Sequence, residues 1–170
     1  GRAIRFGEND VPLMGRVAQG VKGMQLRQGD GVVGMVVVRR EATLCSVTEL
    51  GYAKRTPVSD YPVQKRGGLG TITLDVSNRT GPLVAAKELL DGDELMVITA
   101  SGSAVRVNAV DVPVQGRATQ GKRVVQTGTG DRVVEVSRVA REGDTAPRRR
   151  GGGTDEAGDD SDEQQLELMR

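Results

Sequence analysis

Short apolar segments separated by glycine, proline and charged residues run through most of the chain. Segments of about four to eight residues rich in valine, leucine, isoleucine and threonine, bounded by glycine turns, are typical of β-strands. The two clearest are 44–48 and 95–99, each followed within three residues by a glycine. The same pattern predicts further strands at 23–27, 32–39, 70–77, 83–89, 123–127 and 132–138.

The pattern also repeats with a period close to fifty residues. Three copies of a Gly-x-Ala-x-Arg segment begin at Gly1, Gly51 and Gly102, and each is followed by an aligned Asp, Pro, Arg and Gly. These aligned residues are Asp10, Asp60 and Asp111; Pro12, Pro62 and Pro113; Arg16, Arg66 and Arg117; and Gly20, Gly70 and Gly121. A fixed period with roughly four strands per copy is typical of propeller-type blades.

We therefore predict an all-β fold of β-pinwheel or propeller-like blades of about four strands each, with about two and a half to three blades present. The blades are expected at about 1–43, 44–94 and 95–143. The first copy begins at Gly1 without the apolar strand that precedes Gly51 and Gly102, so we expect a fragment of a longer protein with more repeats upstream. Residues 144–170 are expected to form a disordered acidic tail.

Composition supports this interpretation and excludes much catalytic chemistry. The chain has 25 valines, 24 glycines and three aromatic residues, which favours strands and turns over long helices. It has no histidine and a single cysteine, so the usual zinc, Ser-His and Cys-His sites lack a necessary member. We expect Cys45 to be a buried small hydrophobe, and the aligned Asp10, Asp60 and Asp111 to form turns rather than a metal site.

Charge is divided unevenly along the chain. Residues 1–150 hold 23 Lys and Arg against 16 Asp and Glu, a net +7, whereas residues 151–170 hold one against seven, a net −6. Of the 24 basic residues 19 are arginine, whose planar guanidinium matches phosphate oxygens. This points to a polyanionic partner. The acidic tail either competes with that partner for the basic body or only solvates the chain.

The most distinctive local segment is Gln64-Lys65-Arg66-Gly67-Gly68-Leu69-Gly70, with two cations beside three glycines. Glycine lets backbone N–H groups approach a phosphate, and the cations neutralise it. A tight turn with exposed charges is the structural alternative. The aligned segments 14–20 and 115–121 keep the Arg and the last Gly, which favours a shared role. The alternation in each copy also predicts that Arg5, Arg55 and Arg106 project equivalently, as a row of cations.

Residues 116–122 have the Gly and Lys spacing of a nucleotide-binding P-loop. Arg123 stands where Ser or Thr would hold magnesium, and a valine-rich segment follows instead of a helix. The segment is therefore interpreted as one of the three repeat loops.

Over nearly all of residues 1–143 these repeats resemble the C-terminal domain of the DNA gyrase A protein, a β-pinwheel that wraps DNA. The resemblance rests on Gly1–Phe6 with Gly20–Gly23, on Val47–Thr56, and on Val114–Gly121. Gln64–Gly70 is similar to the signature box of that family, Gln-Arg-Arg-Gly-Gly-Lys-Gly, with Lys65 and Leu69 as departures. A C-terminal domain of topoisomerase IV, in which the box is degraded or absent, and a propeller that binds other proteins are the alternatives.

The resemblance implies a non-catalytic part of an ATP-dependent type II topoisomerase that introduces negative supercoils. The implied partners are double-stranded DNA, the gyrase B protein and a second copy of the gyrase A protein, on the bacterial chromosome in the cytoplasm. The tyrosine that cleaves DNA would lie in the N-terminal region of the gyrase A protein, and ATP and Mg²⁺ would be bound elsewhere, with no cofactor in this chain. No catalytic or metal site is expected here.

The residues expected to contact DNA are the repeat cations and the box. They are Arg5, Arg16, Lys22, Lys54, Arg55, Gln64, Lys65, Arg66, Gly67, Gly68, Gly70, Arg106, Arg117, Lys122 and Arg123.

Overall fold

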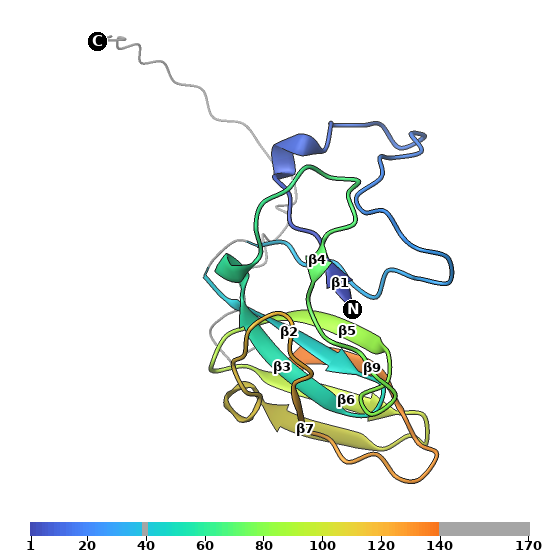
Figure 1. Cartoon of the computed structure of the whole chain (residues 1–170), viewed down its shortest axis with the longest axis vertical. Helices are drawn as coiled ribbons and strands as arrows, with labels where there is room; N and C mark the ends of the chain where they lie inside the picture. The colour runs from blue at the N-terminus through green and yellow to red at the C-terminus, as the bar shows by residue number, and fades with distance from the viewer. Residues whose placement is uncertain (39–40, 140–170) are drawn as a thin grey trace, which may run out of the picture.

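The computed structural model describes residues 1–38 and 41–139, and these form β-strands joined by loops and three single turns of 3₁₀ helix (Figure 1). The all-β prediction is therefore confirmed. The predicted tail at 144–170 lies outside the described residues. No helix among the residues described has the length and apolar character that a membrane span requires.

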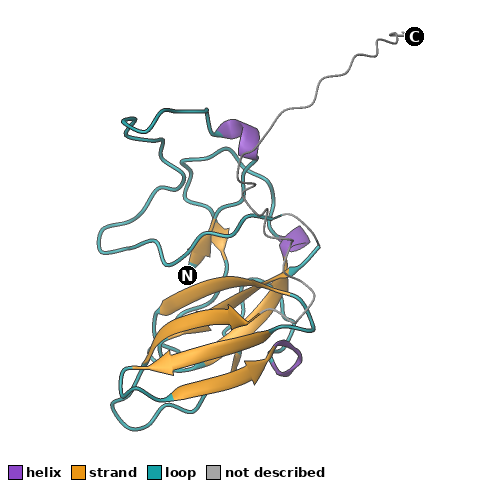
Figure 2. Ribbon diagram, turned by 180° about the vertical axis from the view of Figure 1, so that it is seen from behind, coloured by secondary structure: helices purple, strands orange, loops and turns teal. Residues whose placement is uncertain are grey.

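The strands form three antiparallel sheets, and two of them make up most of the ordered body (Figure 2). The four-stranded sheet has the order β5-β2-β3-β8, with β2 Thr43–Thr48, β3 Tyr52–Pro57, β5 Leu83–Leu89 and β8 Lys122–Arg123. The three-stranded sheet has the order β7-β6-β9, with β6 Glu94–Thr99, β7 Ala104–Asn108 and β9 Val133–Val139. The third sheet pairs β1 Arg2–Ala3 with β4 Thr71–Ile72.

Each repeat enters a 3₁₀ turn shortly after the strand that carries its Gly-x-Ala-x-Arg segment. These turns are η1 Glu8–Asp10, η2 Val58–Asp60 and η3 Ala109–Asp111. The aligned aspartates end them, as expected for turn residues. Asp111 accepts a hydrogen bond from the Asn108 side chain at 3.1 Å rather than from its own backbone.

Strand pairing crosses from one repeat to the next. The short strand β4 of the second repeat pairs with β1 of the first, and β8 of the third pairs with β3 of the second. Parallel bridges Arg5–Val63 and Arg55–Val114 add to each junction. The repeats therefore interlock through their backbones, and blade limits at 43/44 and 94/95 stay a prediction.

The core lies between the two larger sheets. Alternate residues of β2, β6 and β9 point inward, and Cys45, Val47, Leu95, Val97 and Val136 are each at most 2% exposed. Period-two alternation of this kind follows from strand geometry. Cys45 is buried as expected, and burial raises the pKa of its thiol to about 12.

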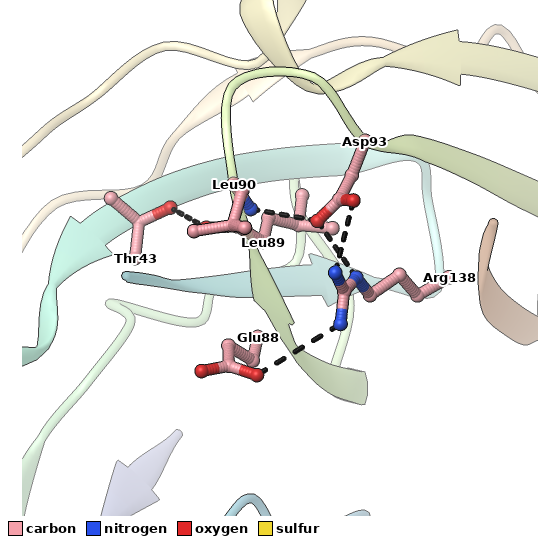
Figure 3. Close-up of polar contacts among 6 residues, drawn as sticks. All are labelled: Thr43, Glu88, Leu89, Leu90, Asp93 and Arg138. Carbon is pink, nitrogen blue, oxygen red and sulfur yellow. Dashed lines mark hydrogen bonds and ion pairs between the residues drawn. The ribbon is translucent and has the colours of Figure 1, made fainter. Parts of the chain in front are cut away.

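A polar clasp joins the two sheets at one end of this core (Figure 3). Arg138 of β9 donates from Nε and Nη2 to both oxygens of the buried Asp93 carboxylate, at 2.7 and 3.0 Å, and its Nη1 lies 3.9 Å from Glu88 of β5. Asp93 also accepts from the Leu90 backbone N–H at 2.7 Å, and Thr43 donates to the Leu89 carbonyl at 3.0 Å. The clasp therefore links β2, β5, β9 and the turn before β6.

Four predicted strands differ from the structure. No strand forms at 23–27 or within 32–38, and the strands predicted at 70–77 and 123–127 reduce to the two-residue β4 and β8. The valine-rich segment 32–38 has no partner ladder in the described chain, so Val32 is 71% exposed. An apolar sequence favours a strand only where a neighbouring strand can pair with it.

Candidate nucleic-acid interface

Three loops carry the aligned Arg and Gly: loop 1 (14–20), loop 2 (64–70) and loop 3 (115–121). Loops 2 and 3 each cross over the strand of the preceding repeat. Gln64 donates its backbone N–H to the Arg5 carbonyl at 2.7 Å, and Gln115 donates to the Arg55 carbonyl at 2.8 Å. Each of these two loops then runs directly into a short strand that pairs with the same neighbour.

The last glycine of loops 2 and 3 allows this close crossing. Gly70 and Gly121 have φ of +66° and +77°, and a Cβ would lie 2.3 Å from the Ala3 carbonyl oxygen and 2.6 Å from that of Ala53. A side chain at either position would meet both backbone strain and a backbone clash. The glycines shared by these loops therefore let the loop backbone rest on the neighbouring strand.

A different side chain lies beneath each crossing. The Ile4 side chain lies close to Gly68, whose Cβ would be 3.6 Å from Cδ1 of Ile4. At the aligned position under loop 3, the fully buried Lys54 donates from Nζ to the carbonyl oxygens of Gly116 and Arg117. Burial, followed by the Arg117 charge, lowers the pKa of Lys54 to about 8. Lys54 thus holds loop 3 from inside.

The aligned arginines Arg5, Arg55 and Arg106 do not form an exposed row, and that prediction is wrong for Arg55. The guanidinium of Arg5 donates to the Val58 carbonyl at 3.0 Å. Arg55, whose side chain is 6% exposed, donates to the Val112 carbonyl at 2.9 Å and pairs with Asp91 at 2.5 Å. Both therefore bind the 3₁₀ segment of the following repeat.

Lys54, which was also expected to contact DNA, is buried, and its ammonium is used inside the fold. Arg106 has no following repeat in the described chain. Its side chain is 61% exposed and pairs with Glu94 at 3.2 Å.

The loop arginines Arg66 and Arg117 are half-buried and reach back to the preceding repeat. Arg66 donates from Nε to the Asp10 carbonyl at 2.9 Å and from Nη1 to the Lys22 carbonyl at 3.2 Å. The Cζ of Arg117 lies 6.0 Å from the centre of the Tyr61 ring. Part of each side chain therefore serves the junction between repeats, and part remains open to a ligand.

The remaining predicted cations are exposed. Within residues 1–38 and 41–139, no ion pair joins them to a carboxylate. They are Arg16, Lys22, Lys65, Lys122 and Arg123. Lys122, Arg123 and Arg106 also line an open hollow of about 210 Å³ between β7 and β8, together with Asp111 and three valines. The five exposed cations are available to an anion without breaking an ion pair among the described residues.

The box glycines of loop 2 are tied to the first repeat. Gly67 has φ of +80° and donates its N–H to the Gly23 carbonyl at 2.7 Å, while the Gly68 carbonyl accepts from the Gln25 N–H at 2.9 Å. The backbone N–H of Gln64 donates to the Arg5 carbonyl, as described above. The backbone donors of Gln64 and Gly67 are therefore occupied within the fold, and side-chain cations carry the charge of this loop.

Sequence reasoning missed one cluster, which gathers around Tyr52. The guanidinium carbons of Arg79 and Arg123 lie 5.2 and 5.1 Å from the centre of the Tyr52 ring. Arg123 stands opposite Tyr52 in the β3–β8 pair, whereas Arg79 comes from the turn before β5. The repeat alignment carries no signal for this cluster, because its members come from two repeats.

No group of three or more Cys, Asp or Glu residues placed to hold a metal ion occurs in the described ranges.

Comparison with known proteins identifies the family. The family described as "DNA gyrase C-terminal domain, beta-propeller" matches residues 1–39, 42–87 and 93–140. This chain belongs to that family. Its resemblance to the gyrase domain, inferred above from the repeats and the box, is therefore confirmed.

Similar proteins agree with this assignment. The DNA gyrase A protein of Klebsiella oxytoca is 41% identical over 140 residues, and that of Deinococcus deserti is 42% identical over 147. The matches cover 82% and 84% of this chain but 16% and 18% of those proteins, so the chain spans less than a fifth of their length.

Two solved structures share the fold. One, titled "Structure of DNA gyrase A C-terminal domain", has a TM-score of 0.76 at 33% identity, covering 82% of this chain and 48% of that one. The C-terminal domain of DNA topoisomerase IV has a TM-score of 0.75 at 23% identity, covering 82% of this chain and 44% of that one, a likeness of fold alone.

Proposed function

We propose that this chain is the DNA-binding and DNA-wrapping part of a DNA gyrase A protein. The observation that carries the proposal is a gyrase C-terminal domain whose surface presents exposed lysines and arginines without carboxylate partners among the described residues. Duplex DNA offers one negative charge per about 1.7 Å of its axis, so a surface of this kind gains affinity by releasing counterions. Greater identity to the gyrase domain than to the topoisomerase IV domain favours gyrase.

The proposed contacts are phosphate contacts and carry little base sequence information. The primary contacts are the exposed cations Arg16, Lys22, Lys65, Lys122 and Arg123. The half-buried Arg66 and Arg117 act as secondary contacts, and Arg106 adds charge beside the hollow. Arg5, Lys54 and Arg55 instead hold neighbouring repeats together, so their effect on DNA is exerted through the shape of the loops.

In the whole protein, wrapping by this domain fixes the handedness of the DNA crossing presented to the cleavage core. Bending the duplex costs on the order of several kcal/mol per few tens of base pairs, which the phosphate contacts must offset. Strand cleavage by a tyrosine of the N-terminal region and ATP hydrolysis with Mg²⁺ on the gyrase B protein belong to the rest of an A2B2 assembly. That assembly works on the chromosome in the cytoplasm.

A salt series of DNA affinity tests the proposal. We expect the chain to bind linear duplex DNA with an affinity that falls steeply as salt rises, because each phosphate contact adds about 0.9 to the slope of log K against log salt. Lys65→Ala with Arg66→Ala should weaken binding and reduce the slope. Arg132→Ala is the matched control, since Arg132 is exposed but faces Glu49 at 3.6 Å. Equal affinities of wild type and the double variant would remove loop 2 from the interface.

A further inference from the structure

The cluster around Tyr52 brings together two cations from separate repeats. Tyr52 begins β3, Arg123 lies opposite it in β8, and Arg79 lies in the turn before β5. Arg79 Nε donates to the Tyr52 hydroxyl oxygen at 3.1 Å. The ring of Tyr52, which is 7% exposed, therefore serves as a fixed support for two guanidinium groups that face solvent.

The cluster has an excess of positive charge. Within the described part of the chain, neither Arg79 nor Arg123 forms an ion pair with a carboxylate. The hydrogen bond from Arg79, with further effects of the Arg79 and Arg123 charges, lowers the pKa of Tyr52 despite the opposing effect of burial. Two like charges held beside one ring repel each other, and a bound anion would relieve that repulsion.

The scaffold does not require this arrangement. At the equivalent junction between the first and second repeats, Arg2 takes the place of Tyr52 and Ile72 takes the place of Arg123. Arg2 there donates to the carbonyls of Leu69 and Gly70, at 2.9 and 2.5 Å, and so faces the loop rather than a second cation. The junction forms in both cases, so a pair of arginines on a tyrosine ring is not needed to form it.

The cluster also continues the proposed DNA surface. Arg123 lies two residues after the end of loop 3, next to the exposed Lys122. The Thr119 carbonyl of loop 3 accepts from the Asp75 N–H at 3.1 Å, and Gln120 Nε2 donates to the Asp75 carboxylate at 3.1 Å. These contacts fix loop 3 against the segment that leads to Arg79. Loop 3 and the cluster are therefore neighbours, so a DNA backbone held at loop 3 would pass close to the cluster.

We propose that Tyr52, Arg79 and Arg123 form a binding site for a backbone phosphate of duplex DNA, an inference that rests on the proposed function. The two guanidinium groups donate charge-assisted hydrogen bonds to the phosphate oxygens. The tyrosine ring holds them in place by cation–π contact, which reduces the side-chain entropy lost on binding. The site belongs to the junction of the second and third repeats and lies outside the family box in loop 2.

Single variants Arg79→Gln and Arg123→Gln test the site with linear duplex DNA in a salt series. Each should lower affinity about tenfold at low salt, the effect of losing one charged hydrogen bond of about 1.4 kcal/mol. Each should also reduce the salt slope by about 1. Arg132→Gln is the control, because it removes an exposed arginine that already faces Glu49. Thermal unfolding of each variant separates lost binding from lost fold, and the exposed turn position of Arg79 gives a variant that leaves the strand ladder intact.

A spectroscopic readout distinguishes phosphate binding from a general charge effect. The chain has two tyrosines, so in Tyr61→Phe the tyrosine ring signals seen by NMR belong to Tyr52 alone. Addition of duplex DNA should shift those signals and raise the pKa of the Tyr52 hydroxyl, because the phosphate offsets the positive charge that lowers it. Unshifted Tyr52 signals at saturating DNA would overturn the site.

The outcomes separate this inference from the proposed function. If Lys65→Ala with Arg66→Ala weakens binding while Arg79→Gln and Arg123→Gln bind as wild type, the cluster is not a phosphate site and the proposed function stands. If the wild-type chain shows no salt-dependent binding to duplex DNA, the proposed function itself fails.

Discussion

At the scale of single residues, Lys54 shows how a repeat protein uses one aligned position for two purposes. Ile4 occupies this position under loop 2 with apolar contact, whereas Lys54 donates to two carbonyls of loop 3. Burial lowers the pKa of Lys54 from 10.5 to about 8. Between those values the unfolded chain binds more protons than the folded one, so the free energy of unfolding contributed by Lys54 rises with pH.

Lys54→Met should abolish this contribution. We expect the difference in the free energy of unfolding between wild type and Lys54→Met to grow in favour of wild type from about pH 8 to about pH 10.5. Urea unfolding at several pH values measures it. Lys65→Met, which changes an exposed lysine of loop 2, is the control. Its free energy of unfolding should change with pH in the same way as that of wild type. Parallel curves for Lys54→Met as well would show that its ammonium is not desolvated.

The sequence predicts the environment of a residue where its own side-chain type determines burial. It does not do so where the contacts of that residue come from a distant part of the chain. Burial of Cys45 followed from its apolar strand. The sequence placed Arg55 on a strand face but did not reveal its partners, because the Val112 carbonyl belongs to the next repeat and Asp91 lies in the turn between β5 and β6. Tyr52, Arg79 and Arg123 were not grouped for the same reason, since cross-strand register between repeats is not readable from a single copy.

At the scale of elements, the crossing of loop 3 over β3 depends on Gly121. Gly121 and Gly130 share φ of +77°, but a Cβ at Gly121 would lie 2.6 Å from the Ala53 carbonyl oxygen, whereas nothing lies within 4 Å at Gly130. Gly130→Ala should therefore cost about 1–2 kcal/mol of unfolding free energy from backbone strain alone. Gly121→Ala should cost more and should also weaken DNA binding, because loop 3 must lift from β3.

Chemical denaturation and duplex binding of the two glycine variants measure these effects side by side. Equal losses of unfolding free energy in Gly121→Ala and Gly130→Ala would mean that loop 3 can move away from β3 without an energetic penalty. A loss of stability in Gly121→Ala with unchanged DNA affinity would show that loop 3 makes no contact with DNA.

The clasp between the sheets is the second element whose strength can be measured. Asp93 is 2% exposed and bonded to Arg138 through both oxygens, so Asp93→Ala leaves a cation without its buried partner and should destabilise the fold by about 3 kcal/mol. Glu94→Ala breaks the exposed pair with Arg106 and should cost less than about 1 kcal/mol. Thermal or urea unfolding of Asp93→Ala and Glu94→Ala measures the two losses of unfolding free energy. Similar small losses in both would show that the clasp adds little to the packing of the sheets.

The strands themselves were predictable where a long pairing partner lies within the same repeat. Strands 44–48, 83–89, 95–99 and 132–138 were placed within one residue of β2, β5, β6 and β9, and each of them pairs within its own repeat, β2 with β5 and β6 with β9. The segments 23–27 and 32–38 carry the same apolar pattern and form no strand. Pairing partners, rather than propensity, decided the difference.

At the scale of the whole molecule, the division of charge has a consequence for binding. Residues 1–150 carry a net +7 and residues 151–170 a net −6, on one chain. Carboxylates tethered to a basic surface compete with phosphates for it, and the competition weakens as salt shortens the Debye length from about 30 Å at 0.01 M to about 3 Å at 1 M. Deleting residues 151–170 should therefore raise affinity for duplex DNA at low salt, with the gain shrinking as salt increases.

A variant of unchanged length separates charge from steric effects. Replacing the acidic residues of 155–163 by their amides should reproduce the gain of the deletion, because both remove the competing charge. If the deletion raises affinity and the neutral variant does not, the tail obstructs DNA by its bulk. If neither changes affinity at low salt, the basic body binds DNA without competition, and the negative charge of the tail serves only to keep the chain in solution.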